Sequence, residues 1–292
     1  MRRPGGSVAL NYSGRCALIT GGSRGIGYAL AERLVDRGAS VVVLARDEEG
    51  LRRAAEGLRA IAEKRGSDGE HVSYLACDVT DEGRLEKKLA RLFSERGAPD
   101  LVVNGAGAAH PGLFVELDSS VFRWMMELNY FGTVNVTRAV VPAMVARGSG
   151  HVVNVSSVAG FLGVFGYTAY GASKFAVAGF SDALRVELKP HGVKVSLVYP
   201  PDTDTDGFRC ENELKPFVTH EISGGGKAMP PGSVADTILR DVARGRYLIT
   251  PGVESTVFFR LSRVLGGLVY PLMDHLVARA ARKETGTDTC MS

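Results

Sequence analysis

The feature that most constrains the fold of this chain is a short apolar run that leads directly into closely spaced glycines and then into a helical pattern. Residues 15–20 (RCALIT) read as a buried strand, GGSRGIG follows, and residues 28–37 have helical periodicity. Glycines let the backbone approach a pyrophosphate, and a helix N-terminus offers free N–H groups and a positive dipole end. A tight turn is the simpler alternative, but the flanking strand and helix favour a nucleotide site. The residues expected to hold the nucleotide here are Gly21, Ser23, Arg24, Gly25, Ile26 and Gly27.

The alternation of strands and helices continues along the chain with short connections. This order predicts an α/β protein with a single-domain, doubly wound parallel sheet of the Rossmann type and about seven strands. Further strands are expected at residues 40–45, 71–77, 100–104, from residue 151, at 193–199 and at 247–250, and helices at 47–65, 81–96 and 118–147. The predicted organisation is a flexible segment (1–13), the sheet domain (14–252) with a substrate lid at about 204–230, an amphipathic helical extension (253–283) and a tail (284–292).

Composition excludes several other classes of protein. The net charge of +3 is mild and no long basic run occurs, so nucleic acid is not an expected partner. The four cysteines are scattered without CxxC or metal-ligand spacing, which predicts reduced thiols in the cytoplasm and no metal site. The first thirteen residues lack the apolar core of a signal peptide, and no apolar run approaches the roughly 20 residues that a spanning helix needs.

The residue that ends the second predicted strand indicates which dinucleotide binds. NAD sites usually place a carboxylate there to accept from the ribose 2′-hydroxyl, whereas this chain has Arg46, which would meet a 2′-phosphate. Arg24 adds a second cation, so NADP is favoured over NAD, with two solvated arginines as the alternative. Asp78, at the next strand end, could accept from an adenine amino group or cap the following helix. Further cofactor contacts are expected at Val79, Asn104, Ala106, Gly107, Pro200 and Thr203.

Tyr170 and Lys174 lie four residues apart at the start of a predicted helix, so they share one helical face. A phenol titrates near ~10 and is a poor acid or base alone, but a cation one turn away favours phenolate. With Ser157 nearby, the three side chains suit proton transfer at a carbonyl or alcohol oxygen. The alternative is a buried tyrosine with a solvated lysine. Asn129 lies in an apolar window and is either a structural bond-former or part of a water relay.

Together these motifs resemble the short-chain dehydrogenase/reductase family. The Thr-Gly-x-x-x-Gly-x-Gly turn, Asn-x-Ala-Gly, a helical Asn, and Ser followed by Tyr-x-x-x-Lys occur in the family's order over roughly residues 13–250. The resemblance implies an NAD(P)-dependent oxidoreductase in which Tyr170 is the acid–base and Lys174 lowers its pKa and bonds the nicotinamide ribose. It also implies that Asn129 supports a relay water and Ser157 orients the substrate oxygen, Ser156 being structural. Gly105 departs from the second Asn of many members.

A narrower likeness is to the 3-ketodihydrosphingosine reductases of this family. It rests on residues 199–205 (YPPDTDT), on Glu211-Asn212 and Lys215-Pro216, and on residues 161–170 (FLGVFGYTAY); Asp206 stands where a Pro is expected. It implies reduction of a long-chain amino ketone lipid with NADPH. Apolar residues near Tyr170 suit an alkyl chain, with core packing or a dimer interface as the alternative. The competing functions are reduction of a steroid, retinal or 3-oxoacyl thioester, and a cofactor-binding scaffold without turnover. The likeness also predicts a dimer or tetramer.

Residues 254–282 carry leucines and phenylalanines at helical spacing with arginines between them. Gly266-Gly267 and Pro271 predict two helical pieces with a bend. Such a segment could lie in a bilayer interface, which would place the protein peripherally on the cytosolic face of a membrane. Packing on the core or on a second subunit is the alternative.

Overall fold

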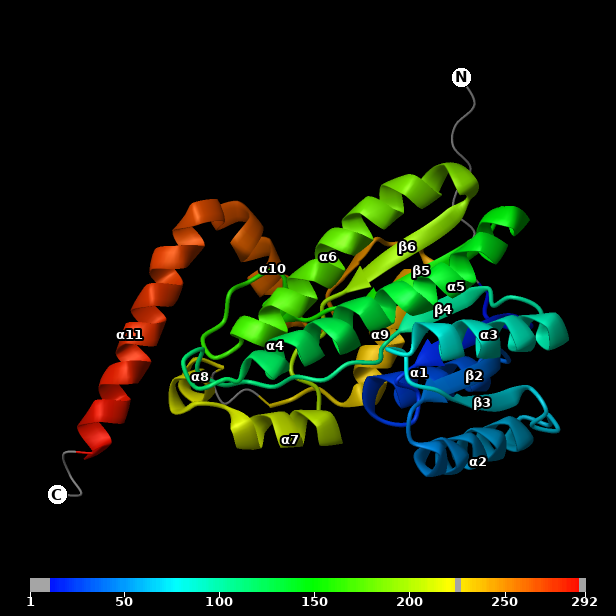
Figure 1. Cartoon of the computed structure of the whole chain (residues 1–292), viewed down its shortest axis with the longest axis horizontal. Coiled ribbons are helices and arrows are strands. Elements are labelled where there is room, and N and C mark those ends of the chain that lie inside the picture. Colours follow the sequence, from blue (N-terminus) through cyan, green and yellow to red (C-terminus); the bar gives the residue numbers. More distant parts are fainter. Residues whose placement is uncertain (1–10, 224–226, 289–292) are drawn as a thin grey trace.

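The computed structural model of this protein describes residues 11–223 and 227–288, and its centre is a seven-stranded, all-parallel sheet (Figure 1). The strand order is β3-β2-β1-β4-β5-β6-β7, which confirms the predicted doubly wound topology. The strands are β1 (Cys16–Thr20), β2 (Ser40–Ala45), β3 (Val72–Ala76), β4 (Leu101–Asn104), β5 (Gly150–Val155), β6 (Val193–Val198) and β7 (Leu248–Ile249).

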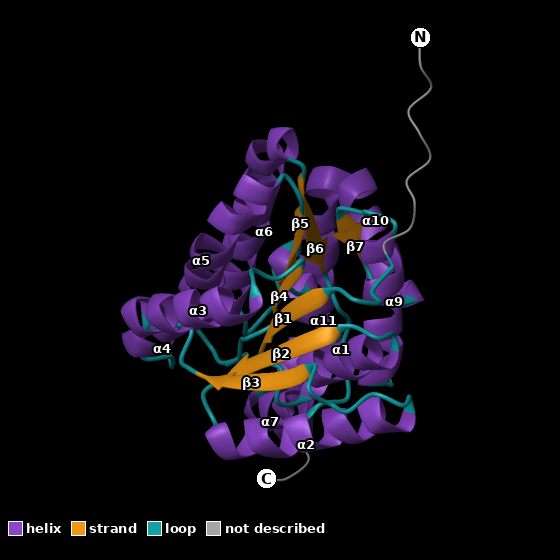
Figure 2. Ribbon diagram, turned by 90° about the vertical axis from the view of Figure 1, so that its right-hand side faces the viewer, coloured by secondary structure: helices purple, strands orange, loops and turns teal. Residues whose placement is uncertain are grey.

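Helices cover both faces of the sheet (Figure 2), with α1, α2 and α9 on one face and α3, α5 and α6 on the other. The helices are α1 (Gly25–Asp36), α2 (Glu48–Lys64), α3 (Glu82–Arg96), α4 (Ser119–Met125), α5 (Gly132–Arg147), α6 (Thr168–Leu188), α7 (Asp206–Leu214), α8 (Phe217–Ile222), α9 (Pro231–Ala243), α10 (Val253–Leu265) and α11 (Val269–Asp288).

The strands are buried on both faces because helices cover both sides of the sheet. Successive side chains of a strand point to opposite faces and therefore enter different cores. In β1, Ile19 joins the core under α1 and α9, whereas its neighbour Leu18 joins the core under α3 and α5. The strand order reverses between β1 and β4, and ligands of such sheets bind outside the carboxyl ends of the strands at that point.

Three helices were not predicted from the sequence: α7 and α8, which fall within the expected lid, and α9, which follows it. α9 begins at Pro231 and buries Val234, Ile238 and Val242 against α1, a spacing of four residues that places them on one face. The proline at the first helical position and this apolar stripe were the available signals.

The helical stretch predicted at 118–147 is continuous but not uniform. Between α4 and α5 lies a π-helical segment, η1 (Met126–Phe131), in which the amide of Gly132 bonds the carbonyl of Glu127. Such segments are rare and occur often at functional sites. Asn129 lies within it.

The two ends of the chain differ from the predicted boundaries. Residues 1–10 and 289–292 lie outside the described residues, but Tyr12 is buried, and its hydroxyl donates to the carbonyl of Leu239 at 2.6 Å. The chain is therefore packed on the core from at least this tyrosine onward. At the other end, α11 continues to Asp288, so the predicted tail from residue 284 begins inside a helix.

The C-terminal helices α10 and α11 form a bent arm that extends away from the sheet (Figure 1). The bend is a short 3-10 turn, η4 (Gly266–Leu268), as the glycine pair predicted, and α11 packs against α8. The root of the arm belongs to the core, because Phe259 packs on Tyr199 and Phe161 with ring centroids 5.5 and 5.2 Å apart. Among the described helices, none combines the length and apolar character that crossing a bilayer requires.

Candidate active site

The glycine turn lies between β1 and α1, at the carboxyl end of the sheet. A Cβ on Gly21, whose φ is +68°, would lie 2.7 Å from the carbonyl oxygen of Gly105, and one on Gly27 would lie 2.3 Å from the carbonyl oxygen of Gly21. The turn therefore needs these glycines to close. The residue before α1, Arg24, makes no capping side-chain bond, which suits a phosphate at this helix end. Ser23 and Ile26, both half-buried, complete the turn.

Thr20 joins the glycine turn to the loop after β4. Its buried hydroxyl accepts hydrogen bonds from the amides of Gly105 and Ala106, each at 3.1 Å, so the small residues of both loops are held together. Thr20 was not among the predicted site residues. Its place directly before the first glycine was the signal available.

Arg46 and Asp78 lie side by side at the ends of β2 and β3. The Arg46 guanidinium is 3.6 Å from the Asp78 carboxylate and is 63% exposed, so it is open to an incoming anion. Asp81, and not Asp78, caps the next helix, α3. The Asp78 carboxylate instead accepts hydrogen bonds from the amide and the hydroxyl of Thr80 at 2.9 and 2.8 Å. Arg24 is exposed as well.

Asn104 corrects the expectation for the fourth strand end. Its side chain faces the interior, where Nδ2 donates to the Thr137 hydroxyl at 3.1 Å and to the Asn154 side-chain oxygen at 2.8 Å. The side chain is therefore buried in the core and is engaged there rather than at the strand end. Val79 is likewise buried, against Gly132.

The loop after β6 returns to the glycine turn. Thr203 is buried, and its hydroxyl donates to the carbonyl of Pro201 at 2.8 Å. Thr205 follows and caps α7, and its methyl group would be 3.2 Å from a Cβ on Gly25. The loop that carries Pro200 and Thr203 therefore leads to Thr205, which lies beside the glycine turn, and the cofactor contacts of Pro200 and Thr203 stay a prediction.

Lys174 projects from α6 toward the strand ends. Its Nζ donates to the carbonyl of Val155 at 3.1 Å and lies 5.7 Å from the centroid of the Tyr170 ring. A Cβ on Gly107 would be 3.3 Å from this Nζ and 2.7 Å from the Asn129 side-chain oxygen, so the three residues meet at one point. Burial lowers the pKa of the Lys174 ammonium to about 8.

Tyr170 titrates in the opposite direction from the one expected. Burial raises its pKa above the ordinary value, the Glu211 carboxylate adds to the rise, a hydrogen bond from Ser157 opposes it, and Asp202 raises it further. Lys174 does not lower it, because the ammonium lies against the ring and bonds the Val155 carbonyl rather than the hydroxyl. The phenol is therefore protonated at neutral pH, as an ordinary phenol is, and the raised pKa makes it a weaker proton donor than a free phenol.

Asn129 is fully bonded within the site. Its oxygen accepts from the amide of Ala108 at 3.0 Å, and its Nδ2 donates to the Ala108 carbonyl at 3.0 Å and to the Ser173 hydroxyl at 2.9 Å. Ser173 in turn donates to the carbonyl of Tyr170 at 2.7 Å. Asn129 thus ties the loop after β4 to the helix that carries Tyr170.

The two serines after β5 have different surroundings. Ser157 caps a 3-10 turn, η2 (Val158–Gly160), accepts from the amide of Ala159 at 3.2 Å and acts to lower the pKa of Tyr170. Ser156 is buried, and its hydroxyl donates to the carbonyl of Lys174 at 3.0 Å, which is a structural contact.

The apolar residues after Ser157 do not all face Tyr170. Leu162, Val164 and Phe165 line a cavity of about 440 Å³ whose other wall is α11. The α6 residues in this cavity are spaced three and four apart and lie on a different helical face from Tyr170 and Lys174. Tyr167 borders the cavity and also packs on Tyr170, with ring centroids 5.5 Å apart.

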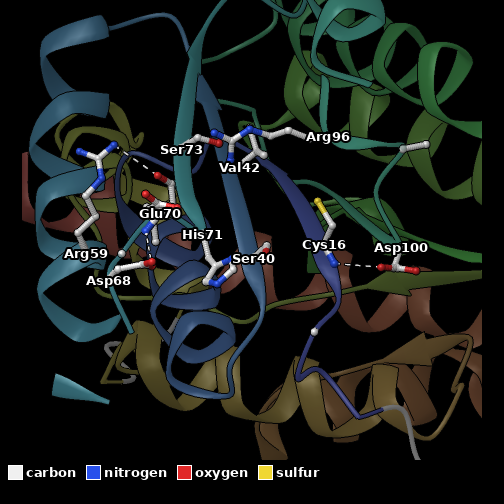
Figure 3. Close-up of a pocket in the computed structure, with 14 residues that line it drawn as sticks. Cys16, Ser40, Val42, Arg59, Asp68, Glu70, His71, Ser73, Arg96 and Asp100 are labelled. Atoms are coloured by element: carbon white, nitrogen blue, oxygen red, sulfur yellow. Dashed lines mark hydrogen bonds between the residues drawn. The ribbon is translucent and has the colours of Figure 1, made fainter. Parts of the chain in front are cut away.

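A larger cleft, of about 940 Å³, lies at the amino ends of the strands, on the side of the sheet away from Tyr170 (Figure 3). It is lined by charged and polar residues at the starts of β1, β2 and β3, among them Cys16, Ser40 and His71. Ligands of doubly wound sheets bind at the carboxyl ends of the strands instead. This cleft is therefore separate from the site around Tyr170.

The parallel sheet, the glycine turn and the Ser–Tyr–Lys group at the strand ends define an oxidoreductase of the dinucleotide-binding class. The family description "short chain dehydrogenase" matches residues 15–215. The chain belongs to this family. It is 38% identical to the 3-ketodihydrosphingosine reductase of Dictyostelium discoideum, over 94% of this chain and 86% of that protein. It is 40% identical to the 3-ketodihydrosphingosine reductase of Bos taurus, over 87% of this chain and 76% of that protein.

A solved structure gives the same fold. A short chain dehydrogenase from Burkholderia cenocepacia, in complex with NADP, is 25% identical and has a TM-score of 0.75, covering 90% of this chain and 99% of that one.

Proposed function

We propose that this protein reduces 3-ketodihydrosphingosine to dihydrosphingosine with NADPH, in sphingolipid synthesis. The observation that carries the proposal is the likeness to the two 3-ketodihydrosphingosine reductases, which extends over most of each chain. The glycine turn and the exposed Arg46 fit the phosphates of NADP, and the protonated Tyr170 fits reduction of a ketone.

The residues around Tyr170 take complementary parts in this reaction. The bound cofactor supplies a hydride to the keto carbon. Tyr170 donates its proton to the forming alkoxide oxygen, which Ser157 holds by its hydroxyl. Lys174 binds the nicotinamide ribose, and Asn129 holds the loop after β4 against the helix that carries Tyr170.

The substrate assignment is tested by NADPH oxidation with 3-ketodihydrosphingosine, acetoacetyl thioester and a steroid ketone, measured side by side. We expect kcat/KM for the amino ketone to exceed the other two by at least about a hundredfold, because the extra interactions of a matched substrate each contribute a few kcal/mol. Preference for either competitor would assign the enzyme to another hydrophobic carbonyl.

Replacing Arg46 with Asp should weaken NADPH binding more than NADH binding. The guanidinium is exposed beside Asp78 and would bond the 2′-phosphate, and a charge-assisted hydrogen bond contributes about 1.5–3 kcal/mol. We therefore expect Kd for NADPH to rise at least about tenfold and Kd for NADH to change little, by fluorescence titration. Arg53→Asp, on the exposed side of α2, is the matched control. Equal losses for both cofactors would exclude recognition of the 2′-phosphate by Arg46.

We further propose that the arm formed by α10 and α11 contacts a membrane surface peripherally, on the cytosolic side, where a lipid substrate resides. Val264 and Leu268 at its bend are 83% and 67% exposed, and exposed arginines lie on both helices. Apolar side chains beside cations are typical of interfacial helices.

The double variant Val264→Asp with Leu268→Asp should therefore bind anionic liposomes at least about tenfold less than wild type, since burying each side chain contributes about 1.5–3 kcal/mol. Cosedimentation measures this, with Val186→Asp, 60% exposed on α6, as control. Unchanged cosedimentation would contradict the proposal.

We also propose that the protein forms a dimer or tetramer. If the double variant has a smaller mass than wild type by light scattering, the arm forms a subunit contact instead of a membrane contact.

A further inference from the structure

Glu211 is the charged residue of the lid region that turns toward the active site. It lies on α7, and its carboxylate accepts a hydrogen bond from the Tyr167 hydroxyl. Its side chain is only 17% exposed, and the ammonium of Lys215, 2% exposed, lies 3.6 Å away. Because the rings of Tyr167 and Tyr170 are in contact, this carboxylate is one tyrosine removed from the predicted proton donor.

Asp202, in the loop after β6, brings a second carboxylate to the same place. Asp202 is exposed, its charge acts on Glu211 and on both tyrosines, and within residues 11–223 and 227–288 no group donates a hydrogen bond to its side-chain oxygens or forms an ion pair with them. The cation that acts on its carboxylate is Lys215, which already lies 3.6 Å from Glu211. Lys174, the other cation near Tyr170, donates to the Val155 carbonyl.

These two carboxylates oppose the reaction that Tyr170 would perform. Both raise the pKa of the Tyr170 hydroxyl, because negative charge nearby disfavours the phenolate left after proton donation. For the same reason, the two carboxylates disfavour a negative charge on the substrate oxygen. A cation bound beside the carboxylates would offset their charge. A substrate with an ammonium group next to its carbonyl carries such a cation.

We propose that Glu211, with Asp202, binds the ammonium group of the substrate and so selects ketones that carry an amine next to the carbonyl. This inference rests on the proposed function and adds the contact that distinguishes an amino ketone from a plain one. Tyr167, through its hydroxyl, and Lys215, through its ammonium, both position Glu211 at the same carboxylate oxygen, Oε1.

The test compares 3-ketodihydrosphingosine with 1-hydroxyoctadecan-3-one, which has the same chain but no amine, using the NADPH-loaded enzyme. Wild type should prefer the amino ketone, and in Glu211→Gln the ratio of the two kcat/KM values should fall at least about tenfold, since a hydrogen bond between charged groups contributes about 1.5–3 kcal/mol. Glu213→Gln, exposed on the same helix, is the matched control and should keep the wild-type ratio.

A second measurement is independent of turnover. Dihydrosphingosine should bind the NADP-loaded wild-type enzyme at least about tenfold more tightly than octadecane-1,3-diol, by calorimetry, and Glu211→Gln should remove most of that difference. Equal losses for both ligands would assign Glu211 a structural role and overturn the inference. If wild type binds the amine selectively but reduces neither ketone, the proposed function fails while the ammonium site stands.

Discussion

Replacing Tyr170 with Phe is expected to lower kcat for ketone reduction by about 10²–10⁴-fold, the usual contribution of a positioned general acid. The hydroxyl is protonated at neutral pH, as an ordinary phenol is, and burial and the Glu211 carboxylate raise its pKa further, so we expect it to enter the reaction as the proton donor. The ring would remain, and with it the packing on Tyr167. Kd for NADPH should therefore change by less than about threefold, since removing one neutral contact costs about 0.5 kcal/mol.

Steady-state kinetics and fluorescence titration measure the two quantities separately. Tyr130→Phe is the matched control, because it also removes one phenolic hydroxyl. Tyr130 lies in η1, where its ring packs on Phe131 and Phe180. Turnover of Tyr170→Phe at the wild-type rate would exclude Tyr170 as the acid. A loss of NADPH affinity as large as the loss of turnover would indicate a disordered site instead.

Replacing Lys174 with Met should lower kcat by about a hundredfold, because the buried cation that we propose as the donor to the cofactor ribose is lost. The same change should stabilise the cofactor-free protein at pH 7. Burial lowers the pKa of Lys174 from 10.5 to about 8. Below pH 8 the ammonium is charged in both states, and burying that charge lowers the free energy of unfolding. The difference corresponds to up to about 3 kcal/mol, reduced by the lost bond to Val155.

The sign of the pH dependence follows from proton binding. Between pH 8 and 10.5 the unfolded chain holds a proton on Lys174 that the folded chain has released, so wild-type stability rises with pH in this window. The Met variant lacks this rise, and its advantage should shrink as pH increases. Denaturant unfolding at pH 7, 8, 9 and 10 measures it, with Lys189→Met, which is exposed, as control. Parallel pH curves for wild type and Lys174→Met would contradict the assignment.

Most of the fold was predictable because its signals are local. Apolar runs of strand length, helical periodicity and the glycine turn each lie within a few consecutive residues, and the strand order follows from the right-handed crossovers of such units. The predicted second strand, residues 40–45, agrees with β2 at both ends. α9 was not predicted, because the predicted lid ends at about residue 230 and no element was expected between it and the strand at 247–250.

The site was predictable only in part. The positions of Tyr170 and Lys174 on one helix follow from their spacing, but the direction of the Tyr170 pKa does not. That direction depends first on the burial of the phenol and then on Glu211, a residue 41 positions later in the sequence that lies on α7. The inward turn of Asn104 likewise depends on Thr137 and Asn154, and the cavity beside α6 depends on where α11 docks.

The π-helical segment η1 has a consequence for how this helical region meets its neighbours. A π turn holds about one residue more than an α turn, so α4 and α5 are rotated against each other by about 100°, the angle of one helical residue. α4 can thereby face α6 while α5 faces α3, which one straight helix of this length could not achieve with the same sequence. Deleting a single residue from η1 would remove this rotation between α4 and α5. Either α4 would then lose its contact with α6 or α5 would lose its contact with α3.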